Sequence, residues 1–368
     1  MIKIAIIGAS YLQLPLVLKA KEMGIETHCF AWEDEAVCKD VSDYFYPISI
    51  VEKEQILEVC QRICINGITS IASDIAVPTI SYVAEQMKLT SNLYSDTLAT
   101  TNKFEMREKF NKHNVLSPKY VIANNYSIDG FNFPLIVKPT DRSGSRGVSR
   151  IEKIEDLGNA VDRAKAISFK NQAIIEEYIS GHEVSVETIS WQGEHFILAI
   201  TDKVTTNEPY FVELEHHQPS MLPKALQQKI KTETIKALSA LNIMYGASHS
   251  EFKITNSGKV YIIEVGARMG GDFIGSDLVR LSTGYDFLKG VINVSLGCFE
   301  TPIIHNEFCS GVYFLSKETT RILPIIQNAK EYSEIVDAKL TDNELHSALC
   351  SADRSGYIIY KSLKRFYL

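Results

Sequence analysis

An apolar strand ending in a lysine runs directly into a flexible cationic loop in the stretch FPLIVKPTDRSGSRGVSRI, residues 133–151. Gly144 and Gly147 lack a Cβ and can adopt positive φ, so backbone N–H groups of this loop can approach an anion closely. No GK[ST] sequence opens a helix after the loop, so the pattern is not a Walker A motif. We interpret it as a flap that closes over a phosphate chain, with a plain hairpin turn as the alternative. The residues expected to contact the phosphates are Lys138, Ser143, Gly144, Ser145, Arg146 and Gly147.

A second stretch, IIEEYISGHEVSVE at residues 174–187, brings acids and an aromatic residue to the end of an apolar strand. The C=O and N–H groups of such an extended segment can pair with the Watson–Crick edge of adenine. Glu183 can accept hydrogen bonds from ribose hydroxyls. The alternative is a strand end that turns at Gly181 and carries solvated acids. The residues assigned to purine binding are Glu176, Glu177, Tyr178, Ile179 and Glu183.

A third stretch, HSEFKITNSGKVYIIEVGARMGG at residues 249–271, has the turn chemistry of a β-hairpin in TNSG. If the loop holds an even number of residues, Glu251 and Glu264 lie on one face, because directly opposed residues share a face. Neighbouring strands are only ~4.8 Å apart, so the two carboxylates repel unless a cation lies between them. Mg²⁺ is the natural occupant, with Mn²⁺ as a substitute, since both favour carboxylate and phosphate oxygens. The structural alternative is neutralisation by a basic neighbour, namely Lys253, Lys259 or Arg268.

Arg268 follows the second acid by four residues, in a glycine-rich run. A guanidinium at this position can form bidentate contacts with a phosphoryl group during its transfer. Its alternative role is a salt bridge back to the two acids. The glycines of the run are Gly266, Gly270 and Gly271.

The composition is that of a globular protein of two or three domains, with 45% hydrophobic and 23% charged residues among 368. The net charge of −7 argues against nucleic acid or an anionic membrane as a principal partner. No apolar run of about 18 residues predicts a membrane span. The N-terminal MIKIAIIGAS reads as a strand and not as an export signal, and the seven cysteines include no CxxC pair. We therefore expect a cytoplasmic protein with buried thiols.

Residues 1–93 alternate apolar strands with amphipathic helices, which predicts a doubly wound parallel sheet covered on both faces. Three strands are expected, in KIAIIGA, ETHCFAW and ITSIAS. Gly8 follows the first strand, as in a dinucleotide-binding fold, but Gln13 stands where that fingerprint needs its third glycine. A nicotinamide or flavin site at this turn is therefore a minor alternative.

Residues 94–300 change character. One helix is expected over SDTLATTNKFEMREKFNKHNV, containing Lys103, and an antiparallel-rich α+β domain follows it. Within this domain we expect a small lid subdomain over about residues 112–178. Residues 301–368 mix short strands with turn signals and predict a small C-terminal α+β unit that completes the fold.

These motifs follow one another as they do in the ATP-grasp superfamily, which residues 94–298 resemble. Residues 1–93 look like the doubly wound domain that precedes the grasp domain in biotin carboxylase and carbamoyl phosphate synthase. The segment ADRSGYIIY resembles part of their small C-terminal domain. The matching order is Lys103, Lys138, SGSRGV, EEYISGHE, Glu251, Glu264 and ARMGG.

The resemblance implies ATP as the nucleotide and Mg²⁺ as the metal. Glu251 and Glu264 would hold the metal, while Arg268 would stabilise an acyl phosphate with Lys138 also at the reacting phosphate. Many members have asparagine two residues after the second acid as a further metal ligand, where this chain has Gly266. The implied nucleotide contacts are Lys103 and Lys138 with the phosphates, Lys138 also with the adenine ring, Glu176 and the backbones of Glu177 and Ile179 with adenine, and Glu183 with the ribose.

Within the superfamily, TDKVTTNEPYFVELEHHQPS and EVGARMGGDFI look most like L-amino-acid ligases and allied carboxylate–amine ligases. This likeness implies that a small carboxylate attacks the γ-phosphate of ATP and that an amine then displaces phosphate from the acyl phosphate, leaving an amide and ADP. Paired histidines beside an acid can recognise a carboxylate or act as a base, or can belong to a polar turn. The residues assigned to the substrate end are Glu213, His216, His217, Arg268, Gly270 and Gly271.

Three other functions fit parts of the pattern. A kinase with the same nucleotide site would phosphorylate a small metabolite, and a non-catalytic protein of this fold would bind ATP without turnover. An oxidoreductase would instead bind NAD at residues 8–13. A homodimer through the first domain is common in similar proteins and is a further expectation.

Overall fold

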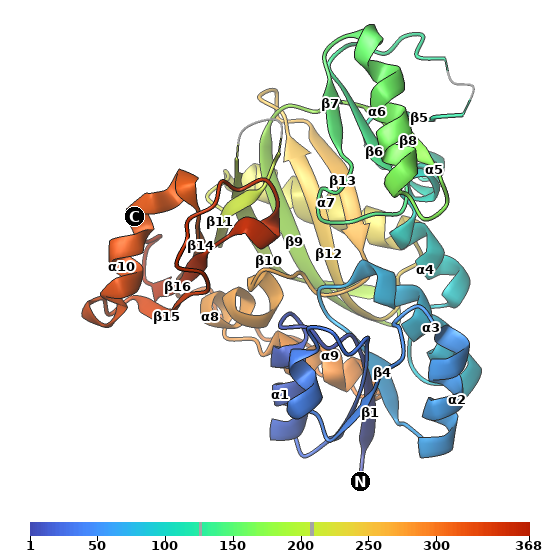
Figure 1. Ribbon diagram of the computed structural model, residues 1–368, viewed down its shortest axis with the longest axis vertical. Helices are drawn as coiled ribbons and strands as arrows, with labels where there is room; N and C mark the ends of the chain where they lie inside the picture. Colours follow the sequence, from blue (N-terminus) through green and yellow to red (C-terminus); the bar gives the residue numbers. More distant parts are fainter. Residues whose placement is uncertain (125–126, 207–209) are drawn as a thin grey trace.

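The strands of the computed structural model form three sheets within the residues that the structure describes, 1–124, 127–206 and 210–368. We call them the N-terminal sheet, the lid sheet and the central sheet. The N-terminal sheet lies at one end of the molecule and the lid sheet at the other, with the central sheet between them (Figure 1).

The N-terminal sheet is wholly parallel. Alternate residues of its first strand point to opposite faces, as the period of a strand requires. Ile4 and Ile6 pack with helices α1 and α9, while Ala5 and Ile7 pack with α2 and α3. The predicted doubly wound architecture is confirmed, with one additional strand, β3, which is too short and too exposed to show a pattern in sequence. The strand order is β3 (Tyr44–Tyr46), β2 (Glu26–Phe30), β1 (Lys3–Ile7) and β4 (Gly67–Thr69), and the helices are α1 (Leu14–Glu22), α2 (Lys53–Ile63), α3 (Val77–Met87) and α9 (Phe287–Ser295).

The turn after β1 is filled by the protein itself. The side chain of Gln13 is buried and donates from Nε2 to the carbonyl oxygen of Ile71 at 2.7 Å. A Cβ on Gly8 would lie 2.9 Å from Gln13 Cδ. The Gln13 side chain occupies the space that a dinucleotide phosphate would need. A nicotinamide or flavin site at this turn was only a minor alternative in the sequence.

The single helix expected around Lys103 is two helices. Asn102 is extended, with φ −124° and ψ 111°, and its side chain accepts hydrogen bonds from the N–H groups of Phe104 and Glu105. This is an N-cap, which starts a new helix because it satisfies N–H groups that have no intrahelical partner. The break makes Lys103 the first residue of the second helix. The two helices are α4 (Tyr94–Thr101) and α5 (Lys103–Lys112).

The lid sheet is antiparallel and is covered on one face by α6 (Ile154–Ile167). The inward residues Leu135 and Val137 of β6 pack against Leu157 and Val161 of the helix. The predicted lid range of about residues 112–178 stays a prediction. The strands of the lid sheet in order are β5 (Tyr120–Ile122), β8 (Ala173–Glu177), β6 (Leu135–Pro139) and β7 (Ser149–Ile151).

The central sheet is antiparallel and packs one face against α5 and α7. Its C-terminal strands join it through the pair β11–β14, so residues 301–368 extend this sheet. Helix α9 packs against both the central and the N-terminal sheets. The strands in order are β13 (Val260–Gly266), β12 (Gly246–Ile254), β9 (His182–Trp191), β10 (Glu194–Thr205), β11 (Glu213–Gln218), β14 (Cys309–Leu315), β16 (Gly356–Ser362) and β15 (Ile335–Leu340), and the remaining helices are α7 (Lys224–Ala240), α8 (Val279–Thr283) and α10 (Leu323–Gln327).

Single helical turns complete the described secondary structure. One of them, Asp74–Ala76, follows β4 and faces the central sheet through Asp74. In the described parts of the chain, no helix has the length and hydropathy needed to cross a bilayer. The domain boundaries near residues 93 and 300 stay predictions. The other turns are Val37–Asp40, Ile274–Leu278, Lys317–Ile322, Ala329–Glu331 and Ser351–Asp353.

Candidate functional site

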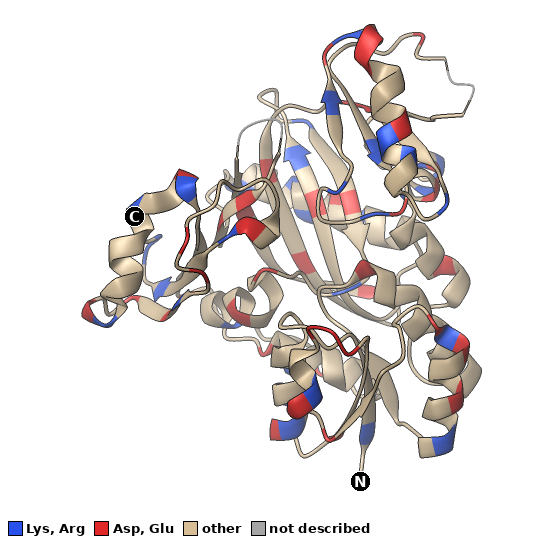
Figure 2. Cartoon of the chain, in the orientation of Figure 1, with Lys and Arg blue, Asp and Glu red and all other residues tan. Residues whose placement is uncertain are grey.

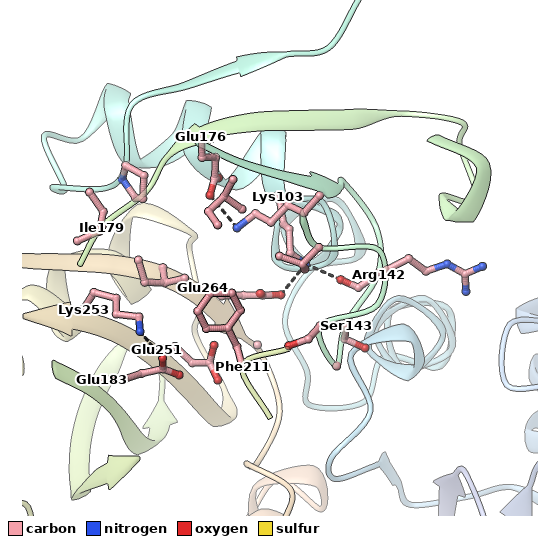
Figure 3. A pocket seen from close by; sticks show the side chains of 18 of the residues that line it. Lys103, Arg142, Ser143, Glu176, Ile179, Glu183, Phe211, Glu251, Lys253 and Glu264 are labelled. Carbon is pink, nitrogen blue, oxygen red and sulfur yellow. Dashed lines mark hydrogen bonds and ion pairs between the residues drawn. The ribbon is translucent and has the colours of Figure 1, made fainter. Parts of the chain in front are cut away.

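A pocket lies between the lid sheet and the face of the central sheet that α7 leaves open (Figure 3). Acidic and basic residues are placed close together along the strands beneath the lid (Figure 2). The predicted site residues that line the pocket are Lys103, Lys138, Ser143, Gly144, Ser145, Glu176, Glu177, Tyr178, Ile179, Glu183, Glu213, Glu251, Glu264 and Arg268. Of the described residues, the predicted ones that the structure does not bring to its lining are Arg146, Gly147, His216, His217, Gly270 and Gly271.

Glu251 and Glu264 are directly opposed in the register of β12 and β13. The reason differs from the one expected, because the loop between the paired residues Ile254 and Val260 is odd-numbered, residues 255–259. A β-bulge at Ile263 shifts the register between the loop and the two acids. An extra residue in one strand moves every later side chain to the other face. The bulge therefore places both carboxylates in the pocket.

Arg107 holds this bulge in place and was not found by sequence reasoning. Its guanidinium is fully buried and donates from Nη2 to the carbonyl oxygen of Ile263 at 2.6 Å. Its Nε also pairs with Glu176 Oε1 at 2.9 Å. One buried cation thus connects the bulge beneath the pocket to the lid strand above it. In sequence Arg107 is an ordinary basic residue of a helix, so no local signal separates it from its neighbours.

Each of the two opposed acids faces a buried lysine. Lys103 Nζ donates to Glu264 Oε1 at 2.9 Å, and Lys203 Nζ donates to Glu251 Oε1 at 2.7 Å. Burial alone would raise the pKa of Glu251, but Lys203 and His249 hold this pKa well below its ordinary value. The carboxylate of Glu251 is therefore kept ready as an anionic oxygen ligand. The basic neighbours that neutralise the acids are not the three expected from sequence.

Glu183 lies between two lysines that the strand register brings to it. It is directly opposed to Lys203 on one side and to Lys253 on the other. Its carboxylate lies 3.2 Å from Lys203 Nζ and 2.6 Å from Lys253 Nζ. Lys203 also approaches Glu213 at 3.4 Å. Burial would lower the pKa of Lys203, but the surrounding acids, Glu251 first, raise it well above its ordinary value.

Lys138 and Glu176 form the upper wall of the pocket. Lys138 Nζ and Glu176 Oε2 are 2.7 Å apart on the paired strands β6 and β8. Burial lowers the pKa of Lys138 despite the attraction of Glu176. The carboxylate of Glu176 is held by Lys138 and Arg107, so its role in reading adenine stays a prediction.

The loop after β6 has the backbone conformation that its glycines predicted. Gly144 and Gly147 have φ values of 65° and 76°. Ser143, Gly144 and Ser145 line the pocket, and the Arg142 carbonyl accepts a hydrogen bond from Lys103 Nζ at 2.6 Å. Gly147 instead packs on Pro139, which a Cβ would approach to 3.0 Å.

Arg146 and Arg142 direct their guanidinium groups away from the pocket. Arg146 is exposed and donates from Nε to the carbonyl oxygen of Ser143 at 3.1 Å. Figure 3 shows the Arg142 side chain pointing away from the acids of the pocket. It donates from Nε to the carbonyl oxygen of Ile167 and stacks on Phe169. The positive charge in the pocket therefore comes from buried lysines such as Lys103 and Lys138 and not from the arginines of this loop.

The two histidines assigned to the substrate end have different surroundings. His217 is buried, with Nε2 at 2.9 Å from Glu215 Oε2 and Nδ1 at 2.9 Å from Tyr360 Oη, so it is bound within the central sheet. His216 is directly opposed to Lys203 in the register of β10 and β11. Burial, followed by the charge of Lys203, lowers the pKa of His216 well below its ordinary value. Three residues near this end, 207–209, lie outside the described residues, as do 125–126 of the lid.

The glycines after Arg268 have structural contacts. The N–H group of Gly270 donates to Glu187 Oε2 at 2.9 Å, and Glu187 in turn pairs with His249. A Cβ on Gly271 would lie 3.2 Å from the side chain of Ala72 in the N-terminal unit. These close approaches explain the glycines without any contact to a substrate.

Arg268 joins the central sheet to the N-terminal unit. Its Nε and Nη2 each donate to a different oxygen of Asp74 at 2.9 Å. Burial would lower the pKa of Arg268, but the charge of Asp74 raises it further above its ordinary value. The salt bridge foreseen for this residue therefore exists, but with Asp74 and not with the two opposed acids. Both residues line the pocket.

Comparison with known proteins relates this site to a family. A sequence model of the ATP-grasp domain family, described as "ATP-grasp domain", matches residues 131–277. These residues run from the lid strand β6 through β13 and so contain most of the pocket. Residues 131–277 are thus similar to an ATP-grasp domain.

Solved ATP-grasp structures share the fold over almost the whole chain. The L-amino acid ligase from Bacillus licheniformis superposes with a TM-score of 0.82 and 21% identity, covering 99% of this chain and 94% of that one. Phosphoribosylglycinamide synthetase from Anaerococcus prevotii superposes with a TM-score of 0.78 and 19% identity, covering 99% and 94%. The predicted fold class is therefore confirmed: a doubly wound α/β unit, an ATP-grasp α+β unit with its lid, and C-terminal α+β segments.

Curated relatives of this chain include proteins named as ligases. Alanine–anticapsin ligase from Bacillus subtilis strain 168 is 26% identical over 303 residues, which is 71% of this chain and 64% of the relative. D-alanine–D-alanine ligase from Trichlorobacter lovleyi is 32% identical over 142 residues, which is 37% of this chain and 43% of the relative. The chain thus spans just under two thirds of the length of the first of these relatives.

The opposed acids of the ATP-grasp domain suit a divalent cation. In the described part of the chain, no three acidic, histidine or cysteine side chains already surround one ion position. The donor set nevertheless fits Mg²⁺, because two carboxylates lie side by side beneath the lid. At Gly266 of the same strand, the carboxylate of Asp74 lies where a side chain would otherwise be.

Proposed function

We propose that this protein is an ATP-dependent carboxylate–amine ligase that forms an amide bond through an acyl phosphate. The observation that carries the proposal is the direct opposition of Glu251 and Glu264. These two acids lie beneath the lid, which carries Lys138 and the glycine-rich loop. The likeness to alanine–anticapsin ligase and to D-alanine–D-alanine ligase supports the reaction class. The substrates in this proposal are two small molecules, a carboxylate and an amine, besides ATP.

The chain's own residues would bind the triphosphate from two sides. Lys103 and Lys138 lie buried in the pocket, where their charges are poorly screened and strongly attract phosphate oxygens. Mg²⁺ held by Glu251 and Glu264 would neutralise charge on the phosphate oxygens. The loop that contains Ser143 and Ser145 lines the pocket. It would shield the acyl phosphate from water until the amine reacts.

In the proposed reaction, a substrate carboxylate oxygen attacks the γ-phosphorus of ATP, and the bond to the β–γ bridging oxygen breaks to release ADP. Arg268 would hold the oxygens of the transferred phosphoryl group. The amine nitrogen then attacks the acyl carbon, phosphate leaves, and the nitrogen loses a proton. The protein supplies position and charge and needs no covalent nucleophile.

A phosphate-release assay tests the proposal. The protein with ATP and Mg²⁺ is offered a panel of carboxylates, including amino acids, with and without amines. Release that requires both a carboxylate and an amine, with the amide identified by mass spectrometry, supports the ligase. ADP formation that yields a phosphorylated alcohol instead would assign the site to a kinase, and nucleotide binding without any turnover would assign a non-catalytic role.

A further inference from the structure

Gly266 occupies the position where many ATP-grasp proteins carry a metal-binding asparagine, so the chain lacks that ligand in its usual place. The space is not empty. A Cβ built on Gly266 would lie 2.5 Å from Asp74 Oδ1 and 3.0 Å from Arg268 Nε. The carboxylate of Asp74 thus reaches into the volume that a side chain at position 266 would take.

The distance is that expected of an asparagine side-chain oxygen. In an asparagine, the side-chain oxygen is two bonds from Cβ, and standard bond lengths put it roughly 2.4 Å away. Asp74 Oδ1 lies at nearly this distance from the Cβ position of residue 266. An oxygen of Asp74, from the N-terminal unit, therefore lies about as far from the Cβ position of residue 266 as the side-chain oxygen of an asparagine there would.

The charge also matches. Asp74 is paired through both oxygens with the guanidinium of Arg268, so the two side chains together are neutral, as an asparagine is. Each carboxylate oxygen carries two lone pairs, and Oδ1 uses one of them for Arg268 Nε. Oδ1 keeps a second lone pair, and Asp74 belongs to the lining of the same pocket as Glu251 and Glu264.

We propose that Asp74 takes over the metal-ligand role of the asparagine that is replaced by Gly266. This inference rests on the proposed function, since it needs the Mg²⁺ site of Glu251 and Glu264. It makes the metal site a joint product of two units, because Asp74 follows β4 of the N-terminal sheet while both glutamates lie on the central sheet. It also explains the glycine, since any larger residue at 266 would collide with Asp74.

The test measures metal binding and not turnover. The dissociation constant of ADP is determined by titration calorimetry with Mn²⁺ and again with EDTA, and the ratio of the two constants gives the metal-dependent gain in affinity. We expect Asp74→Ala to reduce this gain at least tenfold, in line with the loss of a supporting metal contact. The double variant Asp74→Ala/Gly266→Asn moves the oxygen back to β13 and should restore the gain to within about threefold of the natural protein.

Arg268→Met is the matched control, because it removes the same ion pair but keeps the Asp74 oxygen. It should leave the metal-dependent gain unchanged or increase it. An unchanged gain in Asp74→Ala, or an equal loss in Arg268→Met, would overturn the inference. If Asp74→Ala fails to fold, Asp74→Asn serves instead, and it should keep most of the gain because it keeps the oxygen. Failure of the proposed function is distinguishable, because it would show as phosphate release that does not require both a carboxylate and an amine, whereas the metal-dependent gain in ADP affinity is measured without turnover.

Discussion

Glu251 and Glu264 face each other across two strands only because Ile263 bulges out of the ladder between them and the hairpin loop. The hairpin would otherwise pair Glu251 with Ile263 and turn Glu264 to the face covered by α7. The carbonyl oxygen of the bulged residue is held by the buried Arg107. The candidate metal site thus depends on the bulged residue Ile263 of β13 and on Arg107 of helix α5.

Removal of one acid should separate catalysis from nucleotide binding. Glu264→Gln keeps the size of the side chain but removes the charge that would hold the metal, so turnover should fall by at least a hundredfold. ADP should still bind, more weakly, because Lys103 and Lys138 remain. Phosphate release and nucleotide titration measure the two effects. Glu194→Gln, on an exposed strand end, is the control and should change neither; intact turnover in Glu264→Gln would refute the metal assignment.

Insertion of one alanine between Ile263 and Glu264 should move Glu264 out of the pocket. With the bulge kept at Ile263, the inserted residue would oppose Glu251, and Glu264 would turn to the other face of β13. We expect complete loss of the metal-dependent gain in ADP affinity. Deletion of Ile263 is the matched control, because the unshifted ladder then pairs Glu264 directly with Glu251, and it should retain that gain. An insertion variant that is folded by circular dichroism and still binds metal normally would show that the register does not orient the acid.

Loss of Arg107 should destabilise the protein strongly. Arg107→Met leaves Glu176 with Lys138 alone and leaves the Ile263 carbonyl without its buried donor. Breaking a buried ion pair costs about 3–5 kcal/mol of unfolding free energy. Urea denaturation measures the loss, and Arg163→Met on the exposed face of α6 should change stability by no more than about 0.5 kcal/mol. Equal stability of the two variants would contradict the structural role of Arg107.

The pair formed by His249 and Glu187 predicts a pH dependence of stability. Burial would lower the pKa of His249, but Glu187 and Glu251 raise it from 6.5 to about 9. A histidine whose pKa is higher in the folded state stabilises fully below its unfolded value, so this contribution should be present at pH 6 and lost as the pH rises through about 9. The full loss corresponds to roughly 3 kcal/mol.

His249→Gln tests this pH dependence, because glutamine does not titrate. The difference in unfolding free energy between the natural protein and the variant should shrink as the pH rises from 6 to about 9.5, measured by urea denaturation at each pH. A difference that stays constant over this range would show that His249 is not held protonated by its neighbours.

The local order of chemical groups was readable from the sequence. A lysine at a strand end before a glycine-rich loop, a strand ending in acids, and two acids flanking a turn all lie within short segments whose side-chain period is set by the backbone. Lys138, Glu183 and Glu264 from these three segments all line the pocket. The alternation of strands and helices in residues 1–93 likewise implies the parallel sheet, because buried parallel strands are apolar on both faces.

Contacts between distant segments were decided only by the tertiary structure. Asp74 lies 194 residues before its partner Arg268, and Arg107 lies 156 residues before the bulge that it holds. No periodicity relates such positions, since their meeting depends on how whole sheets pack. The bulge itself was not recognised in the run YIIEV, although an unshifted register would turn Glu264 toward the hydrophobic face covered by α7. The sequence by itself therefore determined which groups are available, and the packing of three sheets decided which of them meet.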